Sequence, residues 1–235
     1  MEGKDNSNSN SLQLVRKFED QLERGRLDFF PAEDFEIIVE HYNNNKKFDK
    51  ALNVCSIAIE RFPFSTELKF AKAQVLSNLG QYEEALELLD SALIYQPNDE
   101  EILIVKGSIY SLMGKHKLAI QEYEKILENS EAKDEILYNI GMAYQNSGQF
   151  DKAILNYEKA LKENLNNENV LYELAYCLDI TGKLEKSISY YKEFIDKDPY
   201  SQYGWYNLGI VYNKLENFEE AVNAYEFAIA IDEKF

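Results

Sequence analysis

Small and apolar residues recur along the chain at a fixed interval. The first instance is a small residue that follows an aromatic and two polar residues, Phe48-Asp49-Lys50-Ala51. The equivalent small residues are Ala51, Ala85, Ala119, Ala153, Ser187 and Ala221, and every interval between them is 34 residues. This self-similarity predicts an array of repeats over residues 32–65, 66–99, 100–133, 134–167, 168–201 and 202–235.

The polar and apolar pattern within each repeat predicts two helices. Positions four, eight and eleven share one helical face, and positions twenty, twenty-four and twenty-seven share another. In the first repeat the helices are expected near residues 32–45 and 48–62, and the later pairs follow at steps of 34. Small residues at position eight, such as Gly141, and large ones at position twenty-four, such as Tyr157, predict close helix contact.

The ends of the predicted helices also repeat. A glycine at position fifteen (Gly80, Gly114, Gly148, Gly182) suits the left-handed conformation that follows a helix. Pro63, Pro97 and Pro199, all at position thirty-two, cannot continue a helix and therefore end the second one. Lys69, Lys72 and Lys106 depart from the pattern because they stand where apolar residues are expected.

These positions resemble the tetratricopeptide repeat (TPR) family. The likeness is clearest in Trp205-Tyr206-Asn207-Leu208-Gly209, followed by Ala221, Tyr225 and Ala228, and it covers residues 32–235. The resemblance implies an all-α fold, a right-handed α-solenoid of six tandem helix-turn-helix repeats. Residues 11–31, with an amphipathic stretch from Leu12 to Arg26, are expected to form an N-terminal capping helix, and residues 1–10 a disordered polar tail.

The second helix of the last repeat is expected to have an uncovered apolar face. This helix carries apolar residues from Phe218 to Ile231, and nothing after Phe235 is available to cover them. The natural polypeptide is therefore expected to continue into another repeat or a cap, or to pack this face against a partner or a second copy.

Composition excludes several classes of partner. The formal net charge is −17, and all four arginines lie before residue 62, so neither nucleic acid nor an anionic membrane is an expected ligand. No apolar run reaches transmembrane length, and no secretory signal is present. A cytoplasmic location is expected. Cys55 and Cys177 occupy apolar positions and are expected to be core residues.

The sequence offers no convergent set of catalytic groups. Its two histidines, His41 and His116, stand apart, and there is no His-x-x-x-His or Cys-x-x-Cys pair. Carboxylates are spread along the repeats, as on solvated helix faces. We therefore expect a non-enzymatic protein without metal or cofactor.

The resemblance implies that the first helix of each repeat lines a concave groove. Tyrosines stand once per repeat at position five in the C-terminal half, and amides that bond a peptide backbone lie nearby. The N-terminal half is acidic and is expected to prefer a basic segment. The groove candidates are Glu33, Glu36, Glu40, Phe70, Gln74, Tyr138, Asn139, Met142, Gln145, Asn146, Tyr172, Tyr176, Tyr206, Asn207, Ile210 and Asn213.

Some members of the family grip acidic chaperone tails with lysine and asparagine at positions five and nine. Glu36 and Glu40 stand there in the first repeat, so such a tail is not expected to bind. The leading prediction is an interaction scaffold that holds a peptide or protein segment. The alternatives are contact through the convex face or loops, a docking region of a larger enzyme or secretion or assembly complex, and self-assembly through the end repeats.

Overall fold

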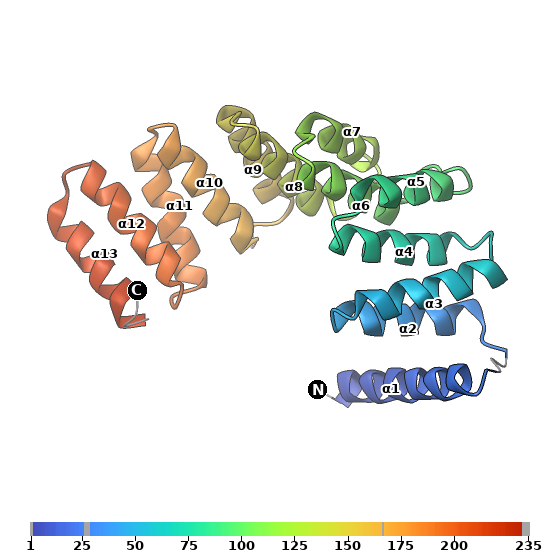
Figure 1. Ribbon diagram of the computed structural model, residues 1–235. Helices are drawn as coiled ribbons and strands as arrows, with labels where there is room; N and C mark the ends of the chain where they lie inside the picture. Colours follow the sequence, from blue (N-terminus) through green and yellow to red (C-terminus); the bar gives the residue numbers. More distant parts are fainter. Residues whose placement is uncertain (1, 26–28, 166, 232–235) are drawn as a thin grey trace. The chain divides into compact units, whose positions relative to one another are not determined.

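The computed structural model describes residues 2–25, 29–165 and 167–231, and all regular structure in these residues is α-helical (Figure 1). The prediction of an all-α fold is therefore confirmed. The chain divides into two compact units, Met1–Ile109 and Tyr110–Phe235. Each unit has its own hydrophobic core.

Unit 1 contains α1 to α5 and most of α6. Their bounds are α1 (Glu2–Glu23), α2 (Ala32–Asn44), α3 (Phe48–Arg61), α4 (Thr66–Asn78), α5 (Tyr82–Leu93) and α6 (Glu100–Leu112). Unit 2 contains α7 (His116–Ile126), α8 (Lys133–Asn146), α9 (Phe150–Glu163), α10 (Glu168–Ile180), α11 (Leu184–Lys197), α12 (Gln202–Lys214) and α13 (Phe218–Ile231). The odd-numbered helices from α3 to α13 begin at residues 48, 82, 116, 150, 184 and 218, each 34 residues after the last.

The turn within each helix pair uses a residue in the left-handed region. Gly80, Gly114, Gly148 and Gly182 have φ between 71° and 75°, as the sequence predicted. The first and last pairs lack this glycine, and Lys46 (φ 57°) and Glu216 (φ 59°) adopt the conformation in its place. Because a side chain is strained there, these two turns carry a conformational cost that the other four avoid.

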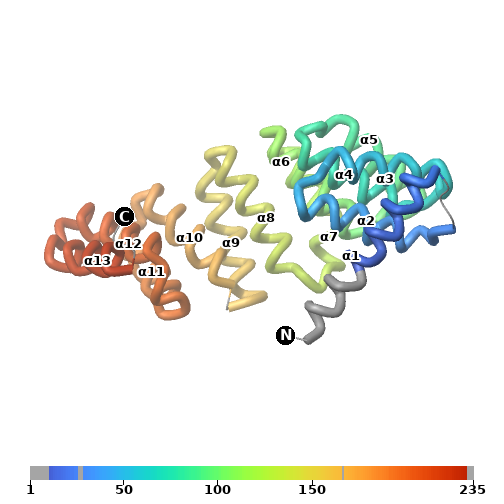
Figure 2. Tube along the Cα trace, turned by 60° about the horizontal axis from the view of Figure 1, so that its bottom comes forward, coloured from blue at the N-terminus to red at the C-terminus, as the bar shows by residue number. Residues whose placement is uncertain are grey.

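Helices of a pair lie in close contact where position eight is glycine. A Cβ atom built on Gly141 would stand 2.4 Å from the ring of Tyr157, and one built on Gly209 would stand 2.6 Å from Tyr225. In unit 2 successive helices then stack side by side along the chain (Figure 2). The predicted packing of a small residue against a large one is thus observed between α8 and α9 and between α12 and α13.

The N-terminal helix covers the first repeat helix. Phe18 of α1 is 1% exposed and meets the rings of Phe30 and Phe35 edge to face, at 5.7 and 6.0 Å. The helix begins at Glu2 and ends at Glu23, whereas the sequence predicted a capping helix over residues 11–31 after a polar tail over residues 1–10. Residues 2–10 hold no proline to stop the helix. The part of the predicted cap at residues 26–28 lies outside the described residues.

The three lysines that depart from the pattern have acidic or aromatic neighbours. Lys72 of α4 stands 3.8 Å from Glu84 of α5. In α4 the neighbouring Leu68 is fully buried, and Lys69 extends over the ring of Tyr95 at 5.2 Å. Lys106, 8% exposed, pairs with Asp90 at 2.6 Å. Each ammonium group therefore reaches a partner, and Lys69 and Lys72 are half-buried whereas Lys106 is buried.

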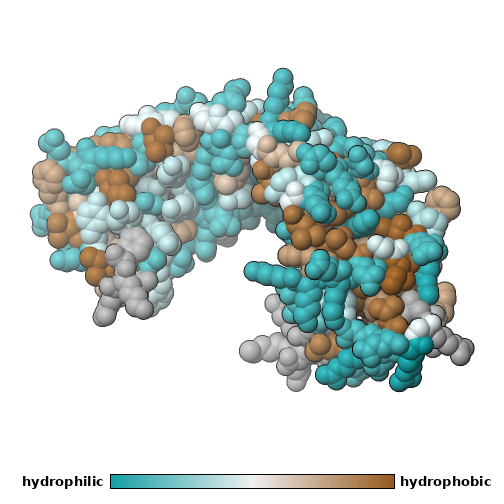
Figure 3. Space-filling model, in the orientation of Figure 1, coloured by the Kyte–Doolittle hydropathy of each residue, from teal (hydrophilic) through white to brown (hydrophobic). Residues whose placement is uncertain are grey.

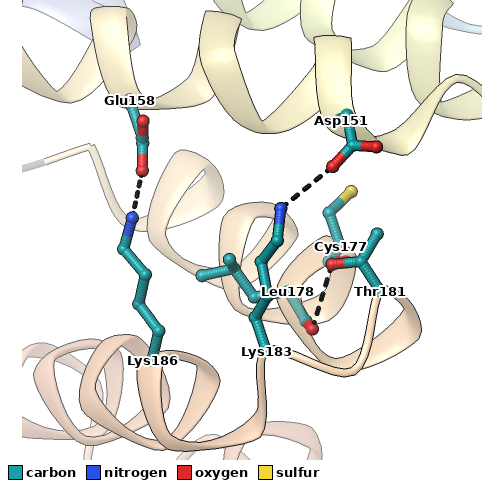
Figure 4. A network of polar contacts seen from close by, with 7 residues as sticks. All are labelled: Asp151, Glu158, Cys177, Leu178, Thr181, Lys183 and Lys186. Atoms are coloured by element: carbon teal, nitrogen blue, oxygen red, sulfur yellow. Dashed lines mark hydrogen bonds and ion pairs between the residues drawn. The ribbon is translucent and has the colours of Figure 1, made fainter.

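Polar contacts join neighbouring pairs at the surface of unit 2. The Lys183 ammonium donates to Asp151 of α9 at 2.9 Å, and Lys186 of α11 pairs with Glu158 (Figure 4). Thr181 donates to the carbonyl oxygens of Cys177 and Leu178 at the end of α10. Since both lysines are about half exposed, these ion pairs contribute little to stability and mainly fix how the pairs meet.

Candidate functional site

The first helices of the repeats in unit 1 line an open groove of about 750 Å³. Glu36, Glu40, Phe70 and Gln74, four of the five groove candidates predicted for this half, are among its lining residues, whereas Glu33 is not. The other lining residues are Asn43, Asn44, Thr66, Glu67, Ala71, Ser77, Asn78, Gln96, Asp99, Glu101, Ile102 and Val105. Helices α2, α4 and the first turns of α6 therefore contribute equivalent positions to one surface.

The groove is acidic, and part of its lining is apolar. Its lining includes the carboxylates of Glu36, Glu40, Glu67, Asp99 and Glu101, and no lysine, arginine or histidine. Apolar contact area comes from Phe70, Ala71, Ile102 and Val105. Amides add hydrogen-bonding groups, and the Asn78 amide donates to Asn43 Oδ1 at 2.9 Å, which links α4 to α2. The arrangement can attract a cation and receive an apolar side chain.

Sequence reasoning missed several of these carboxylates. Glu67 and Glu101 both stand at position two of their repeats, which is a groove-facing position in the resemblance, and Asp99 immediately precedes α6. The repeat pattern therefore contained a signal for Glu67 and Glu101, but none for Asp99. Glu67 is held in place by the hydroxyls of Ser65 and Thr66, each donating at 2.9 Å. Backbone N–H groups and the Ser65 hydroxyl keep the pKa of Glu67 below its usual range, so it carries a charge at neutral pH.

The pKa of Glu36 is shifted in the opposite direction from that of Glu67. Burial raises the pKa of its carboxyl, and the charges of Glu67 and Glu33 raise it further. The groove thus holds like charges close enough to disfavour one another. Such a site gains free energy when a cation neutralises it.

This raised pKa gives a testable pH dependence. The folded protein binds a proton at Glu36 more readily than the unfolded chain, so ionised Glu36 lowers stability at neutral pH, and the loss is relieved as pH falls through the raised pKa. The Glu36→Gln variant should therefore have a higher Tm than wild type at pH 7, and this difference should shrink as pH falls to 4.5 and below. Thermal unfolding from pH 7 to pH 4 measures it. Glu60→Gln, at an exposed position on α3, is the control, and an equal gain in Tm there would contradict the assignment.

Unit 2 carries the predicted row of tyrosines. Tyr138, Tyr172 and Tyr206 each pack on the position-twenty-four ring of their own repeat, with centroid distances of 6.0 Å to Tyr157, 6.1 Å to Tyr191 and 5.7 Å to Tyr225. Tyr138 and Tyr172 are half-buried, and Tyr206 is 40% exposed. One side of each ring therefore belongs to the core, and a ligand could reach only the other.

Two predicted groove amides in unit 2 are engaged within the protein. Gln145 accepts from the Tyr157 hydroxyl (2.9 Å) and the Cys177 thiol (2.9 Å), and it donates to Glu173 (2.6 Å). Asn207 donates to the Tyr172 hydroxyl at 2.7 Å. These bonds connect α8 to α10 and α10 to α12. The structure therefore gives Gln145 and Asn207 roles in joining repeats, which a single sequence could not distinguish from ligand binding.

The remaining candidates in unit 2 differ in accessibility. Asn139, Met142 and Ile210 are half-buried, whereas Asn146, Asn213 and Tyr176 are exposed. Tyr176 is 37% exposed, beside the row on α10. The accessible members are two amides and one aromatic side chain.

Other chemistry is sparse in the described part of the chain. No three His, Cys, Asp or Glu residues there lie close enough to hold a metal ion. Cys55 and Cys177 are fully buried, and burial raises the pKa of both thiols to about 12, so they are protonated at neutral pH. Among the described helices, none combines the length and apolar character needed to cross a bilayer.

Three family models match adjoining or overlapping stretches of the sequence. Residues 203–235 match a tetratricopeptide repeat model, residues 138–202 match a second, and residues 39–153 match the N-terminal TPR region of Psidin. The sequence matches no curated protein.

Solved structures share the fold. PilW, a widely conserved type IV pilus biogenesis factor, superposes with a TM-score of 0.75 at 17% identity, over 87% of this chain and 94% of its own. MamA from Desulfovibrio magneticus gives 0.64 at 19% identity, over 72% and 96%. YrrB, a TPR protein with an unusual peptide-binding site, gives 0.62 at 25% identity, over 76% and 92%.

The recurring helix pairs, their small-to-large contacts and these structural likenesses define an α-solenoid repeat protein. The matched models name the repeat, and the chain belongs to the tetratricopeptide repeat family.

Proposed function

We propose that this chain is a non-enzymatic scaffold that binds a basic polypeptide segment in the groove lined by α2, α4 and the start of α6. The observation that carries the proposal is the lining of that groove, with five carboxylates and no cationic side chain. The raised pKa of Glu36 supports it, because the groove then gains by taking up positive charge. The peptide-binding site of YrrB, a fold relative, is consistent with this use of the fold.

The groove suggests the character of the ligand. Lysine or arginine residues would contact Glu36, Glu40 and Glu101, and an apolar side chain would rest on Phe70 and Ile102. The amides of Asn43, Gln74 and Asn78 would meet the peptide backbone, since an amide both donates and accepts. An acidic segment, such as a chaperone tail, would be repelled.

A matched pair of labelled peptides tests the proposal. One twelve-residue peptide alternates lysine with leucine and the other alternates glutamate with leucine, and fluorescence anisotropy measures their binding. We expect only the basic peptide to bind, and the triple variant Glu36→Gln, Glu40→Gln, Glu101→Gln to bind it roughly 3- to 150-fold more weakly, at about 0.2 to 1 kcal/mol for each ion pair. Affinity should fall with added salt, because exposed charges are screened.

The control variant removes the same charge elsewhere in unit 1. Glu60, Glu83 and Glu87 are exposed on α3 and α5, and none lines the groove. If Glu60→Gln, Glu83→Gln, Glu87→Gln weakens binding as much as the groove triple, the interaction is diffuse and the proposal fails.

The accessible tyrosine surface of unit 2 is the second candidate for peptide contact. Alanine at Tyr138 or Tyr172 would also remove core packing, so it cannot isolate a binding role. Tyr176→Ser changes an exposed ring instead. A peptide that uses this surface loses affinity in Tyr176→Ser and keeps it in the glutamate triple.

A further inference from the structure

Helix α13 presents a continuous apolar stripe to the surface. Phe218, Val222 and Ile229 are 61%, 53% and 54% exposed, and their spacing of four and seven residues places them on one helical face. Apolar residues reach the surface at this end of unit 2, where Figure 1 labels α12 and α13 (Figure 3). The opposite face of α13, with Ala221, Ala224 and Ala228, is buried.

The equivalent residues in the preceding repeats of unit 2 are covered. Ile120 and Ile154, which correspond to Val222, are 7% and 4% exposed, and Ile188, the third equivalent, is half-buried. Leu161 and Ile195, which correspond to Ile229, are 7% and 5% exposed, and Leu127, the third equivalent, is half-buried. Phe150 and Leu184, which correspond to Phe218, are half-buried. The same repeat position is therefore an interface in one pair and a free surface in α13.

The covering element in these repeats is always the first helix of the next pair. Helix α8 packs on α7, α10 on α9 and α12 on α11. Each covering helix has three buried residues at spacings of four and three: Ile136, Ile140 and Ala143; Val170, Leu174 and Cys177; Gly204, Leu208 and Val211. A Cβ atom on Gly204 would stand 2.8 Å from Phe194 and 3.2 Å from Ile195, so α12 sits directly on α11.

We propose that the α13 stripe docks an amphipathic helix of a partner polypeptide, seated as α10 and α12 are on their preceding helices. The docked helix would carry small or aliphatic residues at i, i+4 and i+7. Exposed Glu219 and Glu226 lie beside the stripe, so lysine or arginine at the edge of the partner's apolar face would complement them. This site is separate from the acidic groove of unit 1, and it does not depend on the function proposed there.

The probe is a peptide based on α10, the helix that packs on α9 in this chain. A fluorescein-labelled peptide with the sequence of residues 167–183, carrying Glu168→Lys and Cys177→Ala, is held helical by a hydrocarbon staple on its polar face. The staple is needed because an isolated helix of this length is marginal in water. Anisotropy is measured against the 235-residue chain, and we expect saturable binding.

Two protein variants decide the site. Val222→Ser with Ile229→Ser should weaken binding at least tenfold while leaving the circular dichroism and Tm unchanged, because both side chains are exposed. Leu155→Ser with Leu165→Ser, exposed by 57% and 69% elsewhere in unit 2, should bind as wild type. The glutamate triple of the groove should also bind as wild type, which separates this test from that of the proposed function.

Two outcomes would overturn the proposal. The first is equal affinity of the stapled peptide for the two serine variants, which would indicate non-specific apolar adhesion. The second is self-association of the wild-type chain in sedimentation that Val222→Ser with Ile229→Ser abolishes, because a second copy would then be the occupant.

Discussion

The Phe18→Ala variant is expected to release α1 from the rest of unit 1. Truncating a buried phenylalanine costs about 3 to 5 kcal/mol, a large share of the stability of an ordinary domain. Phe18 is the centre of a cluster with Phe30 and Phe35, all 0 to 1% exposed. Because α1 packs on α2, the loss should appear first as undocking of α1, and the measured change is limited by the free energy with which α1 docks.

Hydrogen exchange read along the chain measures this effect. Amides of α1 and α2 should exchange faster in Phe18→Ala, whereas those of unit 2 should not change. Leu22→Ala, at a position 42% exposed on the same helix, is the matched control and should leave exchange close to wild type. Unchanged protection of α1 in Phe18→Ala would show that the aromatic cluster does not hold the helix.

The second large effect is expected at Gly141, and its sign depends on Tyr157. Alanine in a helix interior is favoured over glycine by about 1 kcal/mol. Here, however, the added Cβ would stand 2.4 Å from a ring that is fully buried and hydrogen-bonded to Gln145, so the ring cannot swing away. Overpacking of this kind costs about 1 to 3 kcal/mol, so Gly141→Ala should destabilise the protein by up to about 2 kcal/mol.

A double-mutant cycle tests the contact directly. In a Tyr157→Leu background the steric conflict is absent, and Gly141→Ala should then stabilise the protein by about 1 kcal/mol through helix propensity. Urea unfolding of the four proteins gives the two differences. If Gly141→Ala changes the free energy of unfolding with the same sign in both backgrounds, the steric conflict between this position and the Tyr157 ring is contradicted.

Much of the fold could be predicted because each structural requirement recurs in the sequence. A stripe such as Ala51 to Ala221 is buried at every repeat, so its period is visible without any structure. The left-handed turn was equally visible at Gly80 and its equivalents. It was hidden at Lys46 and Glu216, which adopt a conformation that their residue types do not favour.

The candidate site was less predictable, and the reason is chemical. An exposed amide or carboxylate has the same sequence signature whether it meets a ligand or a neighbouring helix. Glu36 and Gln74 line a groove, whereas Gln145, a residue type offered for the same role, bonds Tyr157, Cys177 and Glu173. Phe30, fully buried before α2, lay outside the repeat and had no periodic neighbour to identify it.

The size relation between positions eight and twenty-four limits how such an array can be rearranged. The residues at these positions are Val39 with Cys55, Ala73 with Leu89, Gly107 with Tyr123, Gly141 with Tyr157, Ala175 with Tyr191 and Gly209 with Tyr225. As the second member grows from cysteine to tyrosine, the first shrinks from valine to alanine or glycine. A first helix transplanted alone, such as α2 with Val39 placed before α9, would drive a branched side chain into the Tyr157 ring. Where position eight is valine, as in α2, the first helix can therefore move to a repeat with tyrosine at position twenty-four only together with its own second helix.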